Sequence, residues 1–302
     1  MANYLIVLNK DEHTVSFIDP YNGDTVKKIN VDTNPHEVDL NSSGSIAYVT
    51  NSGGNTVSVI DTNQIEEVKR IQHEGFKFPH GVGVTKDDKS LFIASTYANK
   101  VYVIDTTTNQ VRHEITTNQQ KTHMIYFSPN KDLIYVPNIG SNNITIIDVE
   151  DESVITHIPV GVGPEGAAVC PNNNKLYVAN QHDNNIYIIN QDTYEVEKTI
   201  RVGTLPIRLV FSPDGKYAFV PNRESGDLSI IDTELEREIK RIRVGVWPGG
   251  TVFNTDGSYA YVANNKTNDI SVIDVKTLKE VKRIDAGIHP DGMIYLDQEA
   301  RQ

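Results

Sequence analysis

The tripeptide Asn34-Pro35-His36 opens a unit of sequence that recurs through the whole chain. Phrases of this kind follow one another about every 42 to 44 residues, a period typical of four-stranded propeller blades. The phrases are Asn34-Pro35-His36, Phe78-Pro79-His80, Lys121-Thr122-His123, Gly163-Pro164-Glu165, Leu205-Pro206-Ile207, Trp247-Pro248-Gly249 and His289-Pro290-Asp291. The repeat therefore predicts an all-β fold, a seven-bladed β-propeller with four strands in each blade.

The pattern inside each repeat supports this prediction. A second strand ends in a near-constant tetrapeptide, such as Tyr48-Val49-Thr50-Asn51 or Tyr261-Val262-Ala263-Asn264. A third strand is rich in β-branched residues, as in Val57-Ser58-Val59-Ile60-Asp61, and such residues favour strands. Turns such as Ser212-Pro213-Asp214-Gly215 join first to second strands, because Pro presets the first turn angle and Gly tolerates a positive φ.

One repeat is divided between the two ends of the chain. Residues 3–31 supply a second, third and fourth strand, and residues 290–296 supply the missing first strand. We expect the C-terminal strand to pair with the N-terminal ones and close the ring, since closure removes an exposed blade edge. The sequence thus predicts a single propeller domain over residues 1–302.

Composition excludes several classes of protein. The net charge of −12 argues against a nucleic-acid partner, because phosphate binding needs clustered Lys and Arg. No apolar run reaches the roughly 18 residues of a membrane span. The apolar run Met1 to Asn9 lacks a basic start and is too short for a signal peptide, so we expect a cytoplasmic protein, although exported relatives exist.

The third place of the phrase carries the candidate chemistry. His36, His80, His123 and Glu165 occupy equivalent positions on four successive first strands, so we expect them to converge at the centre of the ring. Three imidazoles and a carboxylate suit one divalent transition-metal ion, Zn, Fe, Cu, Mn or Ni. The ion could be structural or catalytic. Alternatively, the imidazoles are inherited features of the repeat, hydrogen-bonded in the channel.

Other residues are expected around such a site. Asp291 occupies the same place in the neighbouring repeat, where it could act as an acid or base. Residues near the channel mouth that could bind a small-molecule substrate are Arg208, Arg223, His182, Tyr97 and Trp247. Each of them could instead be an ordinary loop or packing residue.

The Tyr-Val-Thr-Asn tetrapeptide, the Ser-Pro-Asp-Gly turn and the Ser-Val-Ile-Asp-Thr strand resemble YVTN-type β-propeller repeats. The resemblance covers nearly the entire chain and is specific for the fold. Similar repeats occur in surface-layer proteins, amine-dehydrogenase propellers, haem d1-type propellers and 6-phosphogluconolactonase-like propellers. The haem-attachment motif Cys-x-x-Cys-His is absent, since Cys170 is the one cysteine, so no haem c is expected.

Two functions follow from the sequence. The first is a metal-dependent enzyme acting on a small molecule at the channel mouth, as a lyase, hydrolase or oxidoreductase. The second is a non-catalytic propeller that binds a protein or ligand, with the channel histidines as structural residues.

Overall fold

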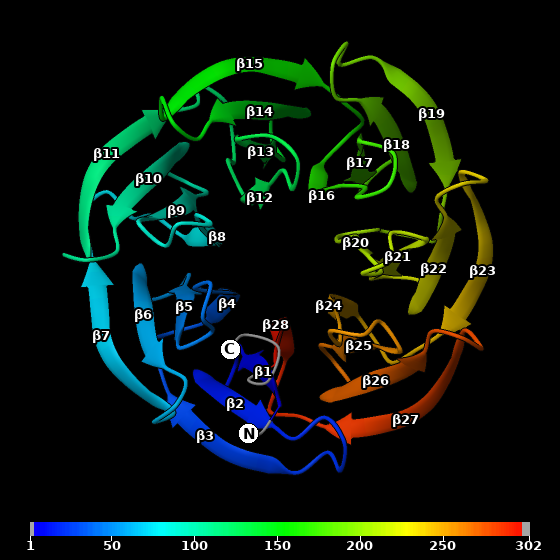
Figure 1. The fold of residues 1–302 in the computed structure, drawn as a ribbon, viewed down its shortest axis with the longest axis horizontal. Coiled ribbons are helices and arrows are strands. Elements are labelled where there is room, and N and C mark those ends of the chain that lie inside the picture. The colour runs from blue at the N-terminus through cyan, green and yellow to red at the C-terminus, as the bar shows by residue number, and fades with distance from the viewer. Residues whose placement is uncertain (1–2, 298–302) are drawn as a thin grey trace.

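The computed structural model describes residues 3–297, and in this range 28 strands form seven four-stranded sheets. The sheets stand as blades around one axis (Figure 1). None of the described residues forms a helix of the length and apolarity needed to cross a membrane. The all-β, seven-bladed prediction is therefore confirmed.

Each blade runs from an innermost strand to an outermost one, with neighbours antiparallel. The innermost strands are β28 (Pro290–Leu296), β4 (Pro35–Leu40), β8 (Pro79–Val84), β12 (Tyr126–Phe127), β16 (Pro164–Val169), β20 (Val210–Phe211) and β24 (Pro248–Phe253). The second strands are β1 (Tyr4–Asn9), β5 (Ile46–Asn51), β9 (Ser90–Ser95), β13 (Leu133–Asn138), β17 (Lys175–Asn180), β21 (Tyr217–Asn222) and β25 (Tyr259–Asn264). The third strands are β2 (Thr14–Ile18), β6 (Thr56–Asp61), β10 (Lys100–Asp105), β14 (Asn143–Asp148), β18 (Asn185–Asn190), β22 (Asp227–Asp232) and β26 (Asp269–Asp274). The outermost strands are β3 (Thr25–Asn30), β7 (Glu66–Gln72), β11 (Gln110–Thr116), β15 (Ser153–Pro159), β19 (Val196–Arg201), β23 (Arg237–Arg243) and β27 (Lys279–Asp285).

The ring is closed by strands from the two ends of the chain. The sheet order β28-β1-β2-β3 places the C-terminal strand beside the N-terminal one. Their register pairs Tyr4 with Leu296 and Val7 with Met293. The predicted closure is confirmed. The single-domain boundary over 1–302 stays a prediction, because residues 1–2 and 298–302 lie outside the described residues.

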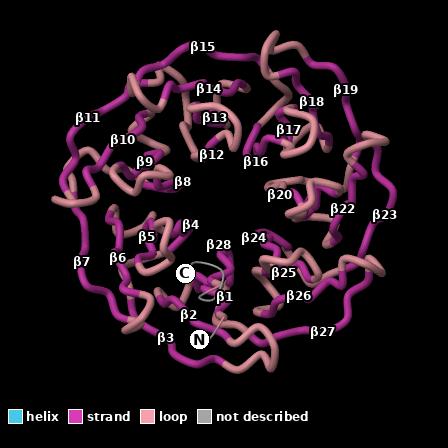
Figure 2. The backbone as a smooth tube through the Cα atoms, in the orientation of Figure 1, coloured by secondary structure: helices cyan, strands magenta, loops and turns pink. Residues whose placement is uncertain are grey.

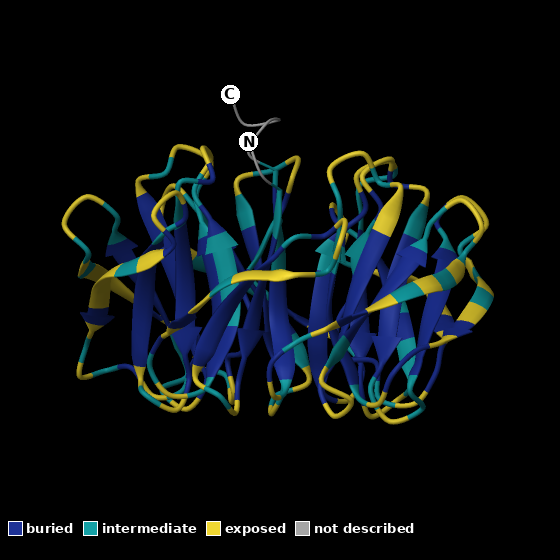
Figure 3. Ribbon diagram, turned by 90° about the horizontal axis from the view of Figure 1, so that it is seen from below, coloured by how far each residue is buried: buried dark blue, intermediate teal, exposed yellow. Residues whose placement is uncertain are grey.

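Burial falls from the inner strands to the outer ones (Figure 3). All five residues of β2 are buried, whereas β7 exposes most of its side chains. The second and third strands are covered on both faces by neighbouring blades, so nearly all of their residues are buried, polar ones included. The loops gather on the two opposite faces of the ring (Figure 3). Seen down the axis, the strands of each blade follow one another from the centre outward (Figure 2).

The residue that begins each phrase has the same unusual backbone conformation in every blade. Its φ is positive, at 59° for Asn34, 59° for Phe78, 57° for Lys121, 66° for Gly163, 60° for Leu205, 59° for Trp247 and 59° for His289. A left-handed conformation is costly for large side chains such as Phe and Trp. Its repetition brings every chain segment onto its first strand by the same turn. The third residues of the phrases are therefore structurally equivalent.

Candidate functional site

A pocket of about 260 Å³ lies on the axis of the ring, at the face where chains enter the first strands. We call it the central pocket. Eight of the ten predicted site residues line it, namely His36, His80, His123, Glu165, Asp291, Arg208, Arg223 and Tyr97. Phe78, Thr96, Ile139, Ile207 and two lysines, Lys10 and Lys121, complete it.

Three imidazoles form a stack along one wall of the central pocket. The ring centroids of His80 and His123 are 3.7 Å apart with an interplanar angle of 29°, and those of His36 and His80 are 4.4 Å apart. His123 Nδ1 shares a hydrogen bond of 3.0 Å with Thr96 Oγ1, and His80 Nδ1 lies 3.1 Å from Met124 Sδ. These contacts engage the Nδ1 atoms of His80 and His123, so their Nε2 atoms are left for the pocket.

Burial keeps all three imidazoles uncharged at neutral pH. Burial, reinforced by the nearby cation Lys10, lowers the pKa of His36 to about 3. The pKa values of His80 and His123 are also well below the ordinary value for histidine, mainly because both side chains are buried. Neutral imidazoles can accept a proton or a hydrogen bond from a ligand.

An ion-pair cluster lies beside the imidazoles. Arg208 donates from Nη1 to Glu165 Oε1 at 3.2 Å and from Nη2 to Glu37 Oε1. Lys10 Nζ lies 3.1 Å from Asp291 Oδ2. Burial raises the pKa of Glu37 to about 7 although Arg208 opposes it. Burial also acts to raise the pKa of Asp291, but Lys10 and the other neighbouring cations outweigh it and hold that pKa below the usual range.

The prediction of a metal ion is wrong. Within residues 3–297 no three or more His, Cys, Asp or Glu side chains are arranged to hold one. Glu165 is engaged by Arg208, and Asp291 by Lys10. The rings of His80 and His123 stack face to face, and their Nδ1 atoms contact Met124 and Thr96. Equivalent register in the repeat brought the residues together but did not give them the geometry of a ligand set.

Two predicted substrate-binding residues lie outside the central pocket. His182 is exposed, and its ring packs against Gly163 closely enough that a Cβ there would lie 2.6 Å from Cδ2. Two cations lie over the ring of Trp247, Arg223 at 4.8 Å and Lys266 at 3.6 Å from the ring centroid. Trp247 can therefore fix Arg223 at the pocket wall without itself lining the pocket.

Thr96 is one of the pocket residues that the sequence did not indicate. It follows the second strand of its blade, at a position that holds Lys10, Ser52, Ile139, Gln181, Arg223 and Asn265 in other blades. Nothing in this variable position signals a partner for His123. The hydrogen bond appears only once the neighbouring blades are packed side by side.

The buried imidazoles predict a specific dependence of stability on pH. His36 has a folded-state pKa of about 3, below its unfolded value of 6.5. Its contribution to stability is therefore complete above pH 6.5 and is lost as the pH falls from 6.5 towards 3. We expect the difference in unfolding free energy between wild type and His36→Gln to shrink by at most about 1.4 kcal/mol per pH unit in this window.

Urea denaturation of both proteins between pH 7 and pH 4 measures this difference. Comparing the two proteins at each pH cancels the titration of groups common to both, including Glu37, whose raised pKa acts in the opposite direction. Parallel stability curves for wild type and His36→Gln contradict the prediction.

Comparisons with known proteins agree with the fold. The family model described as "Lactonase, 7-bladed beta-propeller" matches residues 103–290, well over half of the chain. A model described as "Arylesterase" matches residues 53–124. No curated protein sequence matches the chain.

Several solved structures share the architecture at low sequence identity. A functionally unknown protein from Desulfotomaculum acetoxidans has a TM-score of 0.84 and 18% identity, covering 97% of this chain and 99% of that one. A putative 6-phosphogluconolactonase from Bacteroides fragilis has a TM-score of 0.81 and 14% identity, with 98% of each chain covered. Hydrazine synthase from Kuenenia stuttgartiensis has a TM-score of 0.80 and 20% identity, covering 88% of this chain and 90% of that one.

A fourth similar structure bears on the cofactor. The dihydro-haem d1 dehydrogenase NirN in complex with DHE has a TM-score of 0.73 and 14% identity, covering 96% of this chain and 74% of that one. This fold therefore also occurs in a haem d1 enzyme and does not itself specify a bare metal ion. The sequence predicted a divalent ion and no haem c. That cofactor prediction is corrected, because residues 3–297 contain no group of metal-ligating side chains and a haem d1 enzyme shares the fold.

Proposed function

The chain belongs to the seven-bladed β-propeller lactonase family, and from this premise we propose that it hydrolyses a small cyclic ester in the central pocket. The observation that carries the proposal is the buried, uncharged His123, oriented by Thr96 beside cationic side chains. Both matching family models are named for enzymes that cleave esters, which supports the same class of reaction.

His123 is the proposed general base. In the proposed tautomer its Nδ1–H donates to Thr96 Oγ1, so the unprotonated Nε2 accepts a proton from water while the water oxygen bonds to the ester carbonyl carbon. The carbonyl electron pair moves to its oxygen. Collapse of this intermediate breaks the carbon–oxygen bond of the ring, and the imidazolium returns its proton to the leaving alkoxide. The product is a hydroxy acid.

Charged groups around the pocket suit this step. Lys10 and Arg223 line the same cavity and can stabilise the negative charge that develops on the carbonyl oxygen. The carboxylate of Asp291 acts to raise the pKa of His123, so it favours the imidazolium formed during proton transfer. Asp291 is thus proposed as an ionised stabilising group rather than as an acid.

The size of the pocket limits the substrate. A cavity of about 260 Å³ falls below the range of roughly 300–1,000 Å³ for drug-sized ligands. It suits one small ring with short substituents. The walls combine apolar side chains, such as Ile139 and Ile207, with the cations Lys10 and Arg223.

The test is hydrolysis of a panel of γ- and δ-lactones, 6-phosphogluconolactone and phenyl acetate by purified protein. We expect at least one ester to be cleaved and His123→Gln to lower kcat by about 100-fold or more, because general-base catalysis contributes roughly 10²–10⁴. His157 lies on β15, outside the central pocket, and is hydrogen-bonded to Thr145. The matched control His157→Gln should keep the wild-type rate.

Thr96 provides a second check. Thr96→Val removes the hydrogen bond to His123 Nδ1 with little change in volume, whereas Thr96→Ser retains it. We expect the valine variant to lose rate and to change the tautomer population of His123 in ¹⁵N NMR spectra, and the serine variant to recover both. If no ester is cleaved faster by wild type than by His123→Gln, the proposal fails and the non-catalytic binding propeller becomes the better description.

A further inference from the structure

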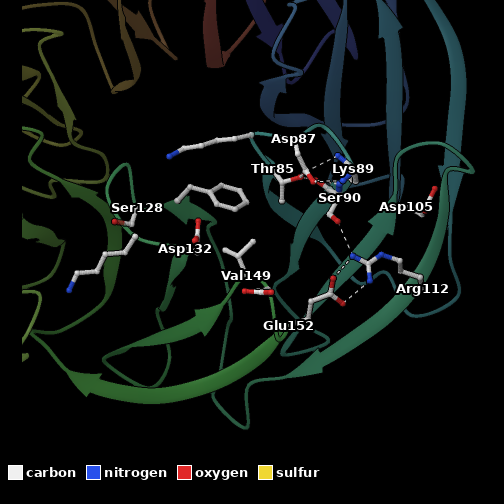
Figure 4. Close-up of a pocket in the computed structure, with 14 residues that line it drawn as sticks. Thr85, Asp87, Lys89, Ser90, Asp105, Arg112, Ser128, Asp132, Val149 and Glu152 are labelled. Carbon is white, nitrogen blue, oxygen red and sulfur yellow. Dashed lines mark hydrogen bonds and ion pairs between the residues drawn. The ribbon is translucent and has the colours of Figure 1, made fainter.

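A second and larger cavity lies on the face opposite the central pocket. Counting the blade of β28 and β1–β3 as the first, it lies between the third blade (β8–β11) and the fourth (β12–β15), and Figure 4 shows its lining. Its volume is about 600 Å³. We call it the inter-blade cleft. It is lined by the turns that join first to second strands, residues 85–90 and 127–132, and by the start of the turn after β14, at Val149 and Glu150. No part of it overlaps the central pocket.

The cleft exists because two neighbouring turns stand apart. At two other blade junctions the corresponding turns are joined directly: Ser42 N donates to Asp88 Oδ1 at 2.7 Å, and Asn172 Nδ2 donates to Asp214 O at 2.7 Å. Between blades three and four the bridge is the long side chain of Lys86, whose Nζ donates to Pro129 O at 2.9 Å. This reach leaves space between the turns.

Hydrogen bonds hold the outer wall of the cleft in place, and aromatic packing holds its floor. Arg112 on β11 crosses to the next blade, where Nη1 donates to Glu152 Oε2 at 2.9 Å, and its Nη2 also donates to Ser90 Oγ at 2.8 Å. Phe127 forms part of the floor, edge-on to Phe92 at 5.8 Å. Gly83 packs closely against the Phe127 ring, since a Cβ there would meet Cε2 at 2.6 Å.

The positively charged side chains of the cleft all have protein partners, whereas two of its carboxylates form no ion pair within residues 3–297. Each cation has a protein partner: Lys86 bonds Pro129 O, Lys89 pairs with Asp87, Arg112 with Glu152, and Lys131 with Asp192. Asp105 accepts hydrogen bonds from the backbone of its own turn. Among the described residues the carboxylates of Asp132 and Glu150 form no ion pair. Asp132 faces the open space beside Val149 (Figure 4).

We propose that the inter-blade cleft binds a small organic ammonium ion with an apolar body. The ammonium group pairs with the exposed carboxylates of Asp132 and Glu150, while the body packs on Phe127 and Val149. An aromatic ring also attracts a cation at its face. The volume of about 600 Å³ lies within the range of small-molecule sites. This site is independent of the proposed esterase activity.

The probe for this proposal is 2-phenylethylamine, which is a cation at pH 7, and its uncharged analogue 2-phenylethanol is the reference. Isothermal titration calorimetry of the full chain at low ionic strength should give saturable binding of the amine with a Kd near or below about 1 mM. The alcohol should bind several-fold more weakly. Amide chemical shifts should change at Ser128 and Val149 and not around His123.

Variants distinguish binding of the amine in the cleft from its general electrostatic attraction to an acidic protein. Asp132→Asn/Glu150→Gln should raise the Kd of the amine about tenfold, as expected for two exposed ion pairs. Asp151→Asn/Glu234→Gln removes the same charge from exposed residues outside the cleft and should leave the Kd unchanged. Equal affinities for amine and alcohol, or an unchanged Kd in the first variant, overturn the proposal.

Discussion

Replacing Arg208 with Met should lower the free energy of unfolding by about 3–5 kcal/mol, a large share of the stability of the ring. Arg208 precedes β20 and is buried at the centre of the ring, where it pairs with Glu37 of β4 and Glu165 of β16. The guanidinium thus joins three blades. Its removal leaves two carboxylates buried without a counter-charge, and an unpaired buried charge costs far more than an unpaired exposed one.

Two further variants test the cause of this loss. Arg208→Met/Glu37→Gln/Glu165→Gln removes the buried charges together with the cation, and it should recover much of the stability measured by urea denaturation. Arg241 pairs with Glu238 at 2.9 Å on the exposed strand β23, so Arg241→Met should cost at most about 1 kcal/mol. Equal losses for Arg208→Met and Arg241→Met contradict the prediction.

The sequence predicted the fold because the repeat encodes it redundantly. Every blade carries the phrase, the turn and the tetrapeptide, so a single irregular member does not obscure the period. The first strand of the fourth blade shows this: β12 spans two residues, and Thr122 forms an isolated bridge with Asn138 instead of strand pairs. The repeat still placed His123 level with His80.

The chemistry of the site was less predictable, because it depends on contacts between repeats. Equivalent positions predicted that His36, His80 and His123 would meet, and their side chains do line one pocket. Spacing could not show that Glu165 would be paired with Arg208, 43 residues later, which removes it from any ligand set. The partner of a buried charge is determined by side-chain reach across the ring, and the repeat period carries no such information.

The residues with left-handed backbone conformation that precede the first strands also depend on contacts between blades that residue type does not reveal. Gly163 and Asn34 favour a positive φ, but Phe78, Leu205 and Trp247 do not. Residue type alone therefore signals this turn in two blades, and its presence in the others follows from the packing of equivalent neighbours.

Deleting residues 288–302 should unfold the protein at temperatures where the intact chain is stable. The deletion removes β28, which pairs with β1 and buries Met293 and Leu296. Each of these side chains contributes about 1.5–3 kcal/mol by burial, and loss of the strand also exposes the edge of β1 and leaves Lys10 without Asp291. Calorimetry should show a strongly lowered Tm or no cooperative transition. Truncation after Asp297, which retains β28, is the control.

A circular permutant distinguishes loss of closure from loss of residues. Tyr4 and Leu296 are register partners in adjacent antiparallel strands, so a short turn can join residue 297 to residue 3. New ends placed between β27 and β28 then make every blade contiguous in sequence and keep all of the buried side chains. Because the strand pairing is preserved, we expect the permutant to fold with a Tm far closer to that of the intact chain than to that of the deletion. A permutant as unstable as the deletion contradicts the argument that β28 acts through strand pairing, and shows instead that stability depends on the covalent link between the last two strands.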